Sequence, residues 1–338
     1  MCSEPLELTA WNVPAYLTSR GLATKADGFL VQELGGGVSN IVLLVQFKAR
    51  PQQRWVVKQS LAKLRVEDDW RSERDRIVRE AEAIEMLRDS LGPHSLPEIV
   101  DVDRTSYVYV MTAAPCGSET WKSLLLRGAV DALIARTAGD LLGKLITAGR
   151  RMPTLRHRFE DRTIFDQLRI DPYYRTTAAR HPELRSIYDE LIRDSWQIRD
   201  SIVHGDYSPK NMLVKDGRVC LIDFEVVHWG DPAFDAAFLL NHLFLKACYR
   251  PCYKALYFGA IREFWHSLWE AAHNQCGEGF ERMTMRHLGA LMMARIDGKS
   301  PVEYITADST KQQVRDLAER ILLKPAKNLE DAVAMAQG

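Results

Sequence analysis

Two polar stretches decide the interpretation of this chain: His204-Gly-Asp-Tyr-Ser-Pro-Lys-Asn211 and, further along, Asp223-Phe-Glu225. Between them, two short apolar runs, Asn211–Val214 and Val219–Ile222, are joined by Lys215-Asp-Gly217. An Asp-Gly turn between two apolar runs is typical of a β-hairpin. The predicted hairpin would gather polar side chains at one end of a small sheet, namely Asp206, Asn211, Asp223 and Glu225.

Such a group of oxygen ligands favours one kind of chemistry. Three carboxylates would repel one another unless a hard cation lay among them, and Mg²⁺ prefers oxygen ligands together with substrate phosphates and water. Phosphoryl transfer also needs a carboxylate that orients the acceptor hydroxyl and accepts its proton. As single residues, His204, Asp206 and Asn211 would be read as turn-capping groups. The ordered set with its hairpin instead predicts a site for Mg²⁺-dependent phosphoryl transfer.

The character of the chain changes near residue 114. Before it, strands are predicted at Ile41–Phe47, Trp55–Lys58 and Tyr107–Met111, with a helix at Arg76–Arg88. After it, helices are predicted at Val130–Ile146, Phe238–Ala247, Tyr257–Ala271, Met283–Ala294 and Thr310–Leu322. The sequence therefore predicts an α+β protein with two lobes. A small antiparallel β-rich lobe covers residues 1–114, and a larger, mainly helical lobe covers residues 115–338.

A glycine-rich stretch in the first lobe suits a nucleotide phosphate. Gly35, Gly36 and Gly37 precede a strand, and glycines let backbone N–H groups approach phosphate because no Cβ intervenes. Ser39 and Asn40 would add side-chain hydrogen bonds. Glycines before a strand also form ordinary turns, so this stretch supports a nucleotide site only together with the hairpin.

Lys58 ends an apolar strand, where a charge is costly without a partner. Glu80 on the following helix is the predicted partner, so that Lys58 would bind phosphate oxygens while Glu80 holds the lysine. Glu82 competes for this role but points roughly 200° away around the helix. The segment Tyr109–Ala114 would bind adenine through backbone groups, with Met111 either a wall of that site or a core residue.

The motifs HGDYSPKN, IDFE and GDPAFDAA resemble the signature of the aminoglycoside phosphotransferase/choline kinase-like family, small-molecule kinases related to protein kinases. The resemblance extends from about Gly35 to the Asp297-Gly-Lys-Ser-Pro stretch. A partial similarity to the 5-methylthioribose kinase branch lies in Val57–Arg65, Trp70 and Arg79-Glu-Ala-Glu82, although the catalytic loop and Phe224 depart from that branch. The resemblance implies a bilobal protein-kinase-like fold, with ATP and Mg²⁺ as cofactors.

The resemblance also implies a role for each matching residue around the hairpin. Asp206 would be the catalytic base, His204 would stabilise the loop, and Asp235 on the next helix would anchor it. The implied metal ligands are Asn211, Asp223 and Glu225, the last of which is alternatively an acceptor-site group.

Two basic and aromatic segments constrain the phosphate acceptor. Phe165-Asp-Gln-Leu-Arg-Ile-Asp-Pro-Tyr-Tyr-Arg175 reads as a loop, and Met292–Lys299 ends an apolar helix with basic residues and an acid. The arginines between positions 150 and 199 are mostly expected to pair with acids on solvated helix faces. A polycationic aminoglycoside would favour an acidic pocket. We therefore expect a neutral or anionic hydroxyl compound, such as a sugar, to bind among Arg169, Tyr173, Tyr174, Arg295 and Lys299.

Composition narrows the functional classes further. The 338 residues include 45 basic and 45 acidic side chains, so the formal net charge of zero argues against a nucleic-acid partner or an anionic membrane surface. Six cysteines without a CxxC pair are expected to be reduced, and we expect a cytoplasmic protein. The leading hypothesis is a small-molecule kinase. The alternatives are 5-methylthioribose kinase, aminoglycoside phosphotransferase and a kinase-shaped, non-catalytic binding protein, and the sequence leaves the oligomeric state open.

Overall fold

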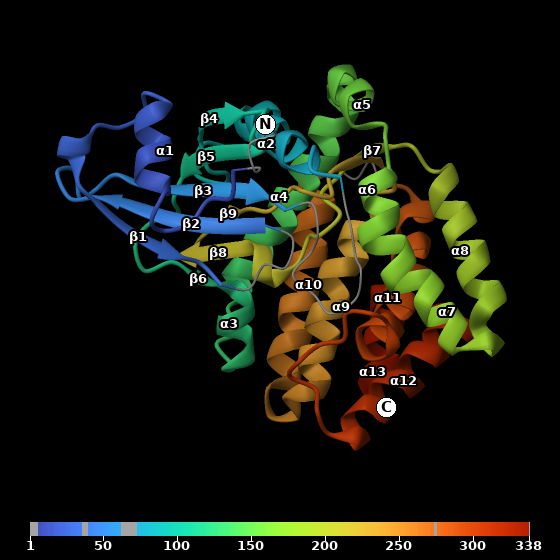
Figure 1. Ribbon diagram of the computed structural model, residues 1–338. Helices are drawn as coiled ribbons and strands as arrows, with labels where there is room; N and C mark the ends of the chain where they lie inside the picture. Colours follow the sequence, from blue (N-terminus) through green and yellow to red (C-terminus); the bar gives the residue numbers. More distant parts are fainter. Residues whose placement is uncertain (1–5, 36–39, 62–72, 274–275, 338) are drawn as a thin grey trace.

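The N-terminal part of the computed structural model is an antiparallel sheet of five strands in the order β1-β2-β3-β5-β4 (Figure 1). The structure describes residues 6–35, 40–61, 73–273 and 276–337. In the sheet, Lys58 of the central strand lies opposite Val42 on one side and Tyr109 on the other. The strands are β1 (Phe29–Glu33), β2 (Asn40–Phe47), β3 (Arg54–Ser60), β4 (Ile99–Asp103) and β5 (Val108–Thr112).

Side chains alternate between the two faces of this sheet, because successive residues of a strand point to opposite sides. Val57 packs on one face in a hydrophobic cluster with α1 (Val13–Ser19). Val56 packs on the other face with residues of α2 (Arg76–Leu91). Lys58 is two residues from Val56 and therefore lies on the face that α2 covers.

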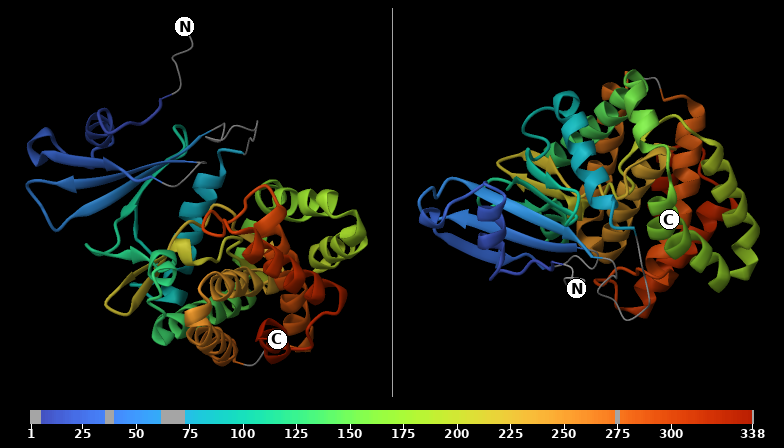
Figure 2. Two further views of the ribbon diagram at one scale, coloured as in Figure 1. Left: turned by 90° about the horizontal axis from the view of Figure 1, so that it is seen from below. Right: turned by 45° about the horizontal axis from the view of Figure 1, so that its top comes forward.

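Helices form most of the chain after residue 115 and lie beside the sheet in all three views (Figures 1 and 2). The long helices α4 (Ala132–Arg151) and α10 (Lys254–Ala271) approach closely, since a Cβ on Gly139 would lie only 2.2 Å from the carbonyl oxygen of Phe264. Within the described ranges, no helix has both the length and the apolar composition to span a bilayer. The antiparallel sheet and the mainly helical remainder confirm the predicted α+β class.

Helix α9 (Ala233–Tyr249) is buried, since almost all of its residues are in the core, and α10 packs against it. The remaining helices complete the helical part. They are α3 (Trp121–Leu126), α5 (Pro153–Phe159), α6 (Thr163–Phe165), α7 (Thr176–Arg180), α8 (Arg185–Gln197), α11 (Glu278–Asp297), α12 (Asp308–Leu323) and α13 (Leu329–Gln337).

The predicted hairpin is present in the helical part. Strands β8 (Met212–Lys215) and β9 (Arg218–Leu221) pair antiparallel. The two residues between them, Asp216 and Gly217, have φ angles of 49° and 73°, the left-handed conformation that a two-residue hairpin turn requires. The hairpin places the residues before β8 and after β9 at one end. The other short strands are β6 (Glu119–Thr120), β7 (Ser201–Val203) and β10 (His228–Gly230).

The segment expected to be a loop, Phe165–Arg175, is helical, so that prediction was wrong. Asp166–Arg175 forms a wide helix of the π type between α6 and α7. Pro172 lies inside this helix and has no N–H group, so it cannot make the hydrogen bond that an α-helix needs at its position. A π-type stretch accommodates such an interruption while the chain stays helical.

Candidate active site

A group of three charged side chains joins the sheet to the helical part. The Nζ atom of Lys58 lies 2.7 and 2.9 Å from the two carboxylate oxygens of Glu80 on α2, and 2.6 Å from Oδ1 of Asp223 beyond β9. Burial by itself lowers the pKa of Lys58, but the carboxylates of Asp223 and Glu80 outweigh it and hold that pKa well above its ordinary value. Glu82 pairs with arginines instead. Lys58 is therefore a charged group whose partner on α2 is Glu80.

Asp235, in the first turn of α9, binds the backbone of the loop 204–211. Its Oδ2 accepts a hydrogen bond from the N–H of His204 at 2.6 Å, and its Oδ1 accepts one from the N–H of Gly205 at 2.9 Å. Gly205 has a φ of +77°, and a Cβ there would lie 2.7 Å from the carbonyl oxygen of Val226, so the loop requires glycine. These are the contacts that an anchoring role for Asp235 requires.

The ring of His204 lies inside this loop. Its Nδ1 accepts a hydrogen bond from the N–H of Asp206 at 3.1 Å, which puts the ring proton on Nε2, and Nε2 donates to the carbonyl of Ile222 at 3.1 Å. Burial lowers the pKa of His204 to about 4, so the ring is neutral at physiological pH. With both nitrogens engaged by backbone groups, His204 fixes the shape of the loop and is not placed to exchange protons with a substrate.

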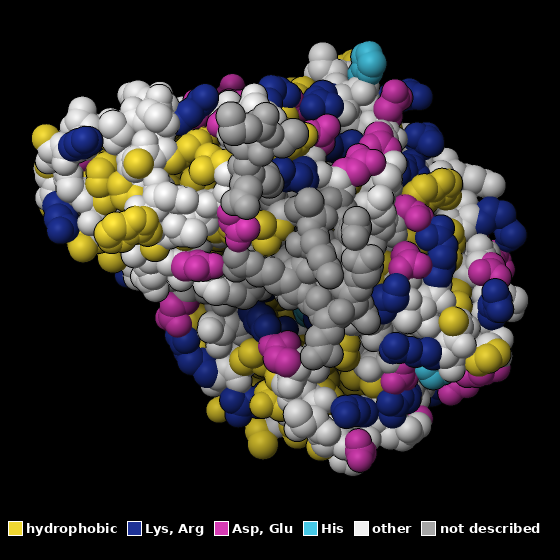
Figure 3. Space-filling view, viewed as in Figure 1, with side chains coloured by type: hydrophobic (Ala, Val, Ile, Leu, Met, Phe, Trp, Pro, Cys, Tyr) yellow, Lys and Arg dark blue, Asp and Glu magenta, His cyan; other side chains and the backbone are white. Residues whose placement is uncertain are grey.

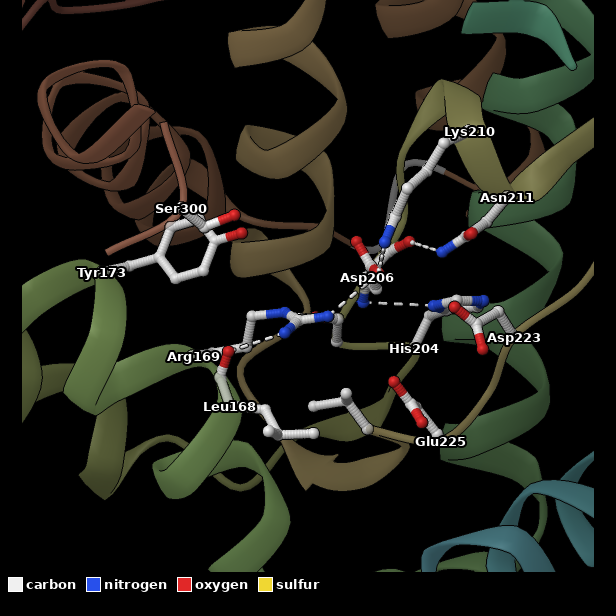
Figure 4. Close-up of polar contacts among 12 residues, drawn as sticks. Leu168, Arg169, Tyr173, His204, Asp206, Lys210, Asn211, Asp223, Glu225 and Ser300 are labelled. Atoms are coloured by element: carbon white, nitrogen blue, oxygen red, sulfur yellow. Dashed lines mark hydrogen bonds and ion pairs between the residues drawn. The ribbon is translucent and has the colours of Figure 1, made fainter. Parts of the chain in front are cut away.

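The carboxylate of Asp206 lies between two cations (Figure 4). Its Oδ2 is 2.8 Å from Nζ of Lys210 and 3.0 Å from Nη2 of Arg169, and the residue is 2% exposed. Burial by itself raises the pKa of Asp206, but Lys210 and Arg169 outweigh it, and the net shift is downward. Asn211 donates from Nδ2 to the backbone carbonyl of Asp206 at 3.0 Å. Asp206 is therefore ionised and able to accept a proton.

Sequence reasoning missed Lys210 and the contact of Arg169 with Asp206. Lys210 lies in the same loop, four residues after Asp206, and this short spacing was an available signal. Arg169 comes from the π helix, where its Nε donates to the carbonyl of Gly205 at 2.6 Å. The sequence offers no comparable signal for a contact between residues so far apart.

Asn211 and Asp223 have the chemistry expected of ligands for a hard cation. Asn211 makes its hydrogen bond to Asp206 through Nδ2, so this bond does not occupy the amide oxygen, the atom that would bind a metal. The side chain of Asp223 is 21% exposed and presents a carboxylate. Among the residues that the structure describes, no three His, Cys, Asp or Glu side chains form a metal-binding group. Mg²⁺ fits such a small donor set, because it keeps several water ligands and takes others from substrate phosphates.

Two residues expected at this site bind each other. The Nδ2 atom of Asn40, at the start of β2, donates to Oε2 of Glu225 at 2.8 Å, and Nε of Arg76 lies 3.5 Å from the same oxygen. The expected roles of Asn40 at the phosphate and of Glu225 at the metal or the acceptor stay predictions. The contact makes Asn40 and Glu225 a second link between the sheet and the helical part.

The other residues expected at the nucleotide site fall into two groups. Gly36, Gly37 and Ser39 lie outside the described residues, and Gly35 is exposed just after β1. Met111 lies in β5 within the hydrophobic cluster beneath α2, which matches its alternative reading as a core residue. Most of the expected adenine-binding connector is also β5, so the connector proper begins after Thr112.

The five residues expected to bind the acceptor are only partly brought together. Nη1 of Arg295 donates to the hydroxyl of Tyr173 at 3.0 Å. The guanidinium of Arg169 lies over the same ring, 5.8 Å from its centre (Figure 4). Tyr174 is 1% exposed and bonds to a ring nitrogen of a core histidine, so its expected place in an acceptor site is wrong. Lys299 lies at the surface, where it pairs with an aspartate.

Residues 30–272 match the phosphotransferase enzyme family, APH. The chain belongs to this family. Its curated relatives include methylthioribose kinases of Cronobacter sakazakii, 23% identical over 72% of this chain and 67% of that protein, and of Pectobacterium atrosepticum, 24% identical over 65% and 61%. For the second relative, the matched region spans less than two thirds of that protein's length.

Solved structures of phosphotransferases share the fold at low sequence identity. An amicoumacin kinase in complex with AMP-PNP and Ca²⁺ superposes with a TM-score of 0.58, at 14% identity, over 93% of this chain and 94% of that one. An ethanolamine kinase of Plasmodium vivax gives a TM-score of 0.59, at 14% identity, over 96% and 94%. The protein-kinase-like fold predicted from the sequence is thus confirmed, and so is the family resemblance.

Proposed function

We propose that this protein is an ATP- and Mg²⁺-dependent phosphotransferase that acts on a hydroxyl group of a small molecule. Residues 1–114 would form the nucleotide-binding lobe, and residues 115–338 would provide the catalytic loop and the acceptor site. The single observation that carries the proposal is the pairing of Lys58 with both Glu80 and Asp223, close to the loop that holds the ionised Asp206. A phosphate-binding lysine, its partner and a catalytic carboxylate are the parts that phosphoryl transfer needs.

Asp206 is the proposed base. As the acceptor oxygen bonds to the γ-phosphorus of ATP, its hydroxyl proton passes to Asp206, and ADP leaves with the electron pair of the broken P–O bond. Lys58 would bind phosphate oxygens, held in place by Glu80, and backbone groups of the Gly35–Gly37 stretch, with Ser39, would cover the phosphates. Asn211 and Asp223 would hold Mg²⁺, which when bound neutralises charge on the phosphate oxygens.

The acceptor is proposed to be a neutral or anionic sugar-like or hydroxylated metabolite. Arg169 and Lys210 flank Asp206, so a polycationic aminoglycoside would meet like charge next to the base. 5-Methylthioribose is the second candidate, because the curated relatives are named methylthioribose kinases.

The test is release of ADP from ATP in the presence of a panel of sugars, hydroxy acids, 5-methylthioribose and aminoglycosides. Asp206→Asn should lower kcat by about 1,000-fold with folding preserved, because the base is lost while the shape stays. Asp216→Asn is the matched control, since Asp216 lies in the exposed hairpin turn, where asparagine is also favoured. Equal turnover by both variants would contradict a catalytic role, and exclusive use of aminoglycosides would contradict the acceptor class.

A further inference from the structure

One face of α9 leads away from the loop 204–211 and carries side chains that the proposed chemistry does not use. Asp235, Phe238, His242 and Lys246 are spaced three or four residues apart and therefore lie on the same side of the helix. Phe238 packs against the ring of Tyr173 at 5.8 Å, and His242 packs against Phe238 at 5.5 Å. The face thus runs from the anchor of the loop, past Tyr173, to Lys246.

Lys246 is a fully buried lysine whose charge, when the side chain is protonated, has little to balance it. Its Nζ atom donates one hydrogen bond, at 3.2 Å, to the carbonyl of His242 on its own helix, and lies 5.2 Å from the centre of the Tyr304 ring. Within the described part of the chain, no carboxylate lies within ion-pair distance of it. A buried charge without a counter-ion destabilises a fold, so a lysine at this position indicates a functional role.

Arg295 on α11 is a second cation without a carboxylate partner among the described residues. Its Nη1 donates to the hydroxyls of Tyr173 and Ser300, at 3.0 and 2.9 Å, and to the backbone carbonyl of Ser300. Its Nε is buried and has no hydrogen-bond partner, and neither has the buried hydroxyl of Tyr304. Arg295 is partly exposed, so it can contact a ligand directly.

Two cations, Arg169 and Arg295, lie against the ring of Tyr173. We define the cationic cluster as four basic residues, Arg169, Lys210, Lys246 and Arg295; of these, Arg169 and Lys210 pair with the carboxylate of Asp206. Tyr173 reports this field: burial by itself raises the pKa of its hydroxyl, but Arg295 and Arg169 outweigh burial and the net shift is downward. Near Lys246, Lys122 forms an ion pair with Glu303 at 2.5 Å.

We propose that the acceptor carries an anionic group, a carboxylate or a phosphate, which Arg295 binds and Lys246 stabilises from behind, while its hydroxyl faces Asp206. The inference rests on the proposed kinase function and narrows its acceptor to hydroxylated anions. Figure 4 places Tyr173 and Ser300, the partners of Arg295, on the side of Asp206 opposite Asn211, where an acceptor would approach without meeting the metal ligands. The cationic cluster also repels polycations. The same side chains would therefore favour anionic acceptors and exclude polycationic ones.

Matched acceptors test this inference: glycerate beside glycerol, and gluconate beside glucitol, each with ATP. We expect the acids to be the better substrates, with kcat/KM about 100-fold higher than for the neutral partners, as one charge-assisted contact provides. Arg295→Gln should remove this preference, because it lowers kcat/KM for the acids far more than kcat/KM for the neutral acceptors. Arg286→Gln is the control on the same helix, because Arg286 pairs with surface carboxylates.

Lys246→Met separates binding from a structural role. Below pH 7, where Lys246 is protonated, its replacement should raise Tm, while kcat/KM for the acids falls about tenfold. If Lys246 had a structural role alone, Lys246→Met would instead lower Tm and affect all acceptors alike. Binding of gluconate and glycerate, measured by calorimetry on the wild type and Arg295→Gln, gives a readout independent of turnover. If neutral acceptors are phosphorylated as well as acids, the inference fails and the kinase function stands. If neither acid binds nor reacts, the inference is overturned, and loss of ATP turnover with every acceptor would overturn the proposed function as well.

Discussion

The Nζ atom of Lys58 lies 2.6 Å from Oδ1 of Asp223, although the two residues are 165 positions apart and belong to different parts of the fold. Lys58 comes from the centre of the sheet, and Asp223 from the chain after the hairpin of the helical part. The contact gives the lysine two carboxylate partners, because Glu80 binds it as well. Removal of the charge on Lys58 or on either carboxylate should therefore change the free energy of unfolding.

Lys58→Met should destabilise the protein by about 3 to 5 kcal/mol, because it leaves the buried carboxylate of Glu80 without a counter-ion. The double variant Lys58→Met with Glu80→Gln should recover most of this loss, since neither side chain is then charged, while phosphoryl transfer stays low in both. Urea unfolding of the single and double variants, with ADP release, provides the measurement. If the double variant recovers activity, Lys58 does not bind phosphate.

Gly205→Ala should lower kcat by about 100-fold or more and reduce stability by roughly 2 to 4 kcal/mol, because the new Cβ would lie 2.7 Å from the carbonyl oxygen of Val226 and would displace the catalytic loop. Gly217→Ala is a close control. It has a similar φ of +73°, but its Cβ would meet only a side-chain carbon of Leu133 at 3.5 Å. Gly217→Ala should lower the free energy of unfolding by about 1 kcal/mol and leave kcat unchanged. Equal effects of the two substitutions on kcat would show that loop placement is not the cause.

Asp223→Asn should raise the Mg²⁺ concentration needed for half-maximal activity by about tenfold or more, because an amide oxygen binds a hard cation more weakly than a carboxylate does. A titration of ADP release with MgCl₂ measures this requirement, and a chelator should abolish turnover of the wild type reversibly. Asp216→Asn, at the exposed turn, should keep the wild-type requirement. An unchanged requirement in Asp223→Asn would exclude this residue as a metal ligand.

Lys246→Met should stabilise the protein in a pH-dependent way. Burial, together with Lys122 and Arg295, lowers the pKa of Lys246 from 10.5 to about 7, so between these values the unfolded chain holds a proton that the native protein lacks. Native stability therefore rises with pH across this window. The variant should be more stable by roughly 2 to 4 kcal/mol below pH 7, and the difference should vanish near pH 10.5. Charged and titratable groups that face this site are His242, Lys122, Arg295, Glu303 and Tyr304.

Denaturant unfolding of the wild type and Lys246→Met between pH 6 and pH 10 checks this prediction. Lys144→Met serves as the reference, because Lys144 is an exposed residue paired with Asp140 on its own helix. A constant stability difference across the range would mean that Lys246 is protonated in the native protein at all these pH values.

The parts of the site that sequence reasoning could place are those governed by local periodicity. The Asp-Gly turn predicted the hairpin, and the cost of a charge at the end of an apolar strand predicted a partner for Lys58, for which Glu80 on the next helix was the candidate. Contacts between distant elements were not predictable in this way. Asn40 and Glu225 are 185 residues apart, and their hydrogen bond depends on how the sheet sits on the helices.

The π helix shows a different limit. A segment that mixes Pro172 with arginines, aspartates and two tyrosines reads as a loop, and a loop does not distinguish Tyr173 from Tyr174. In a helix, neighbouring residues point in different directions, so one tyrosine lies beside Arg295 and the other in the core. Arg169 was placed near the acceptor from the same segment, but its contact with Asp206 needed the helix to be known.

Two contacts, Lys58 with Asp223 and Asn40 with Glu225, cross from the sheet to the helical part. Any motion that separates the lobes must break both contacts. The polar groups released from each contact must then be hydrated as the lobes separate. We therefore expect opening to be cooperative, with partly open forms scarce. On the proposed kinase function, both contacts would have to open before ATP enters, so this opening would limit the rate of nucleotide entry.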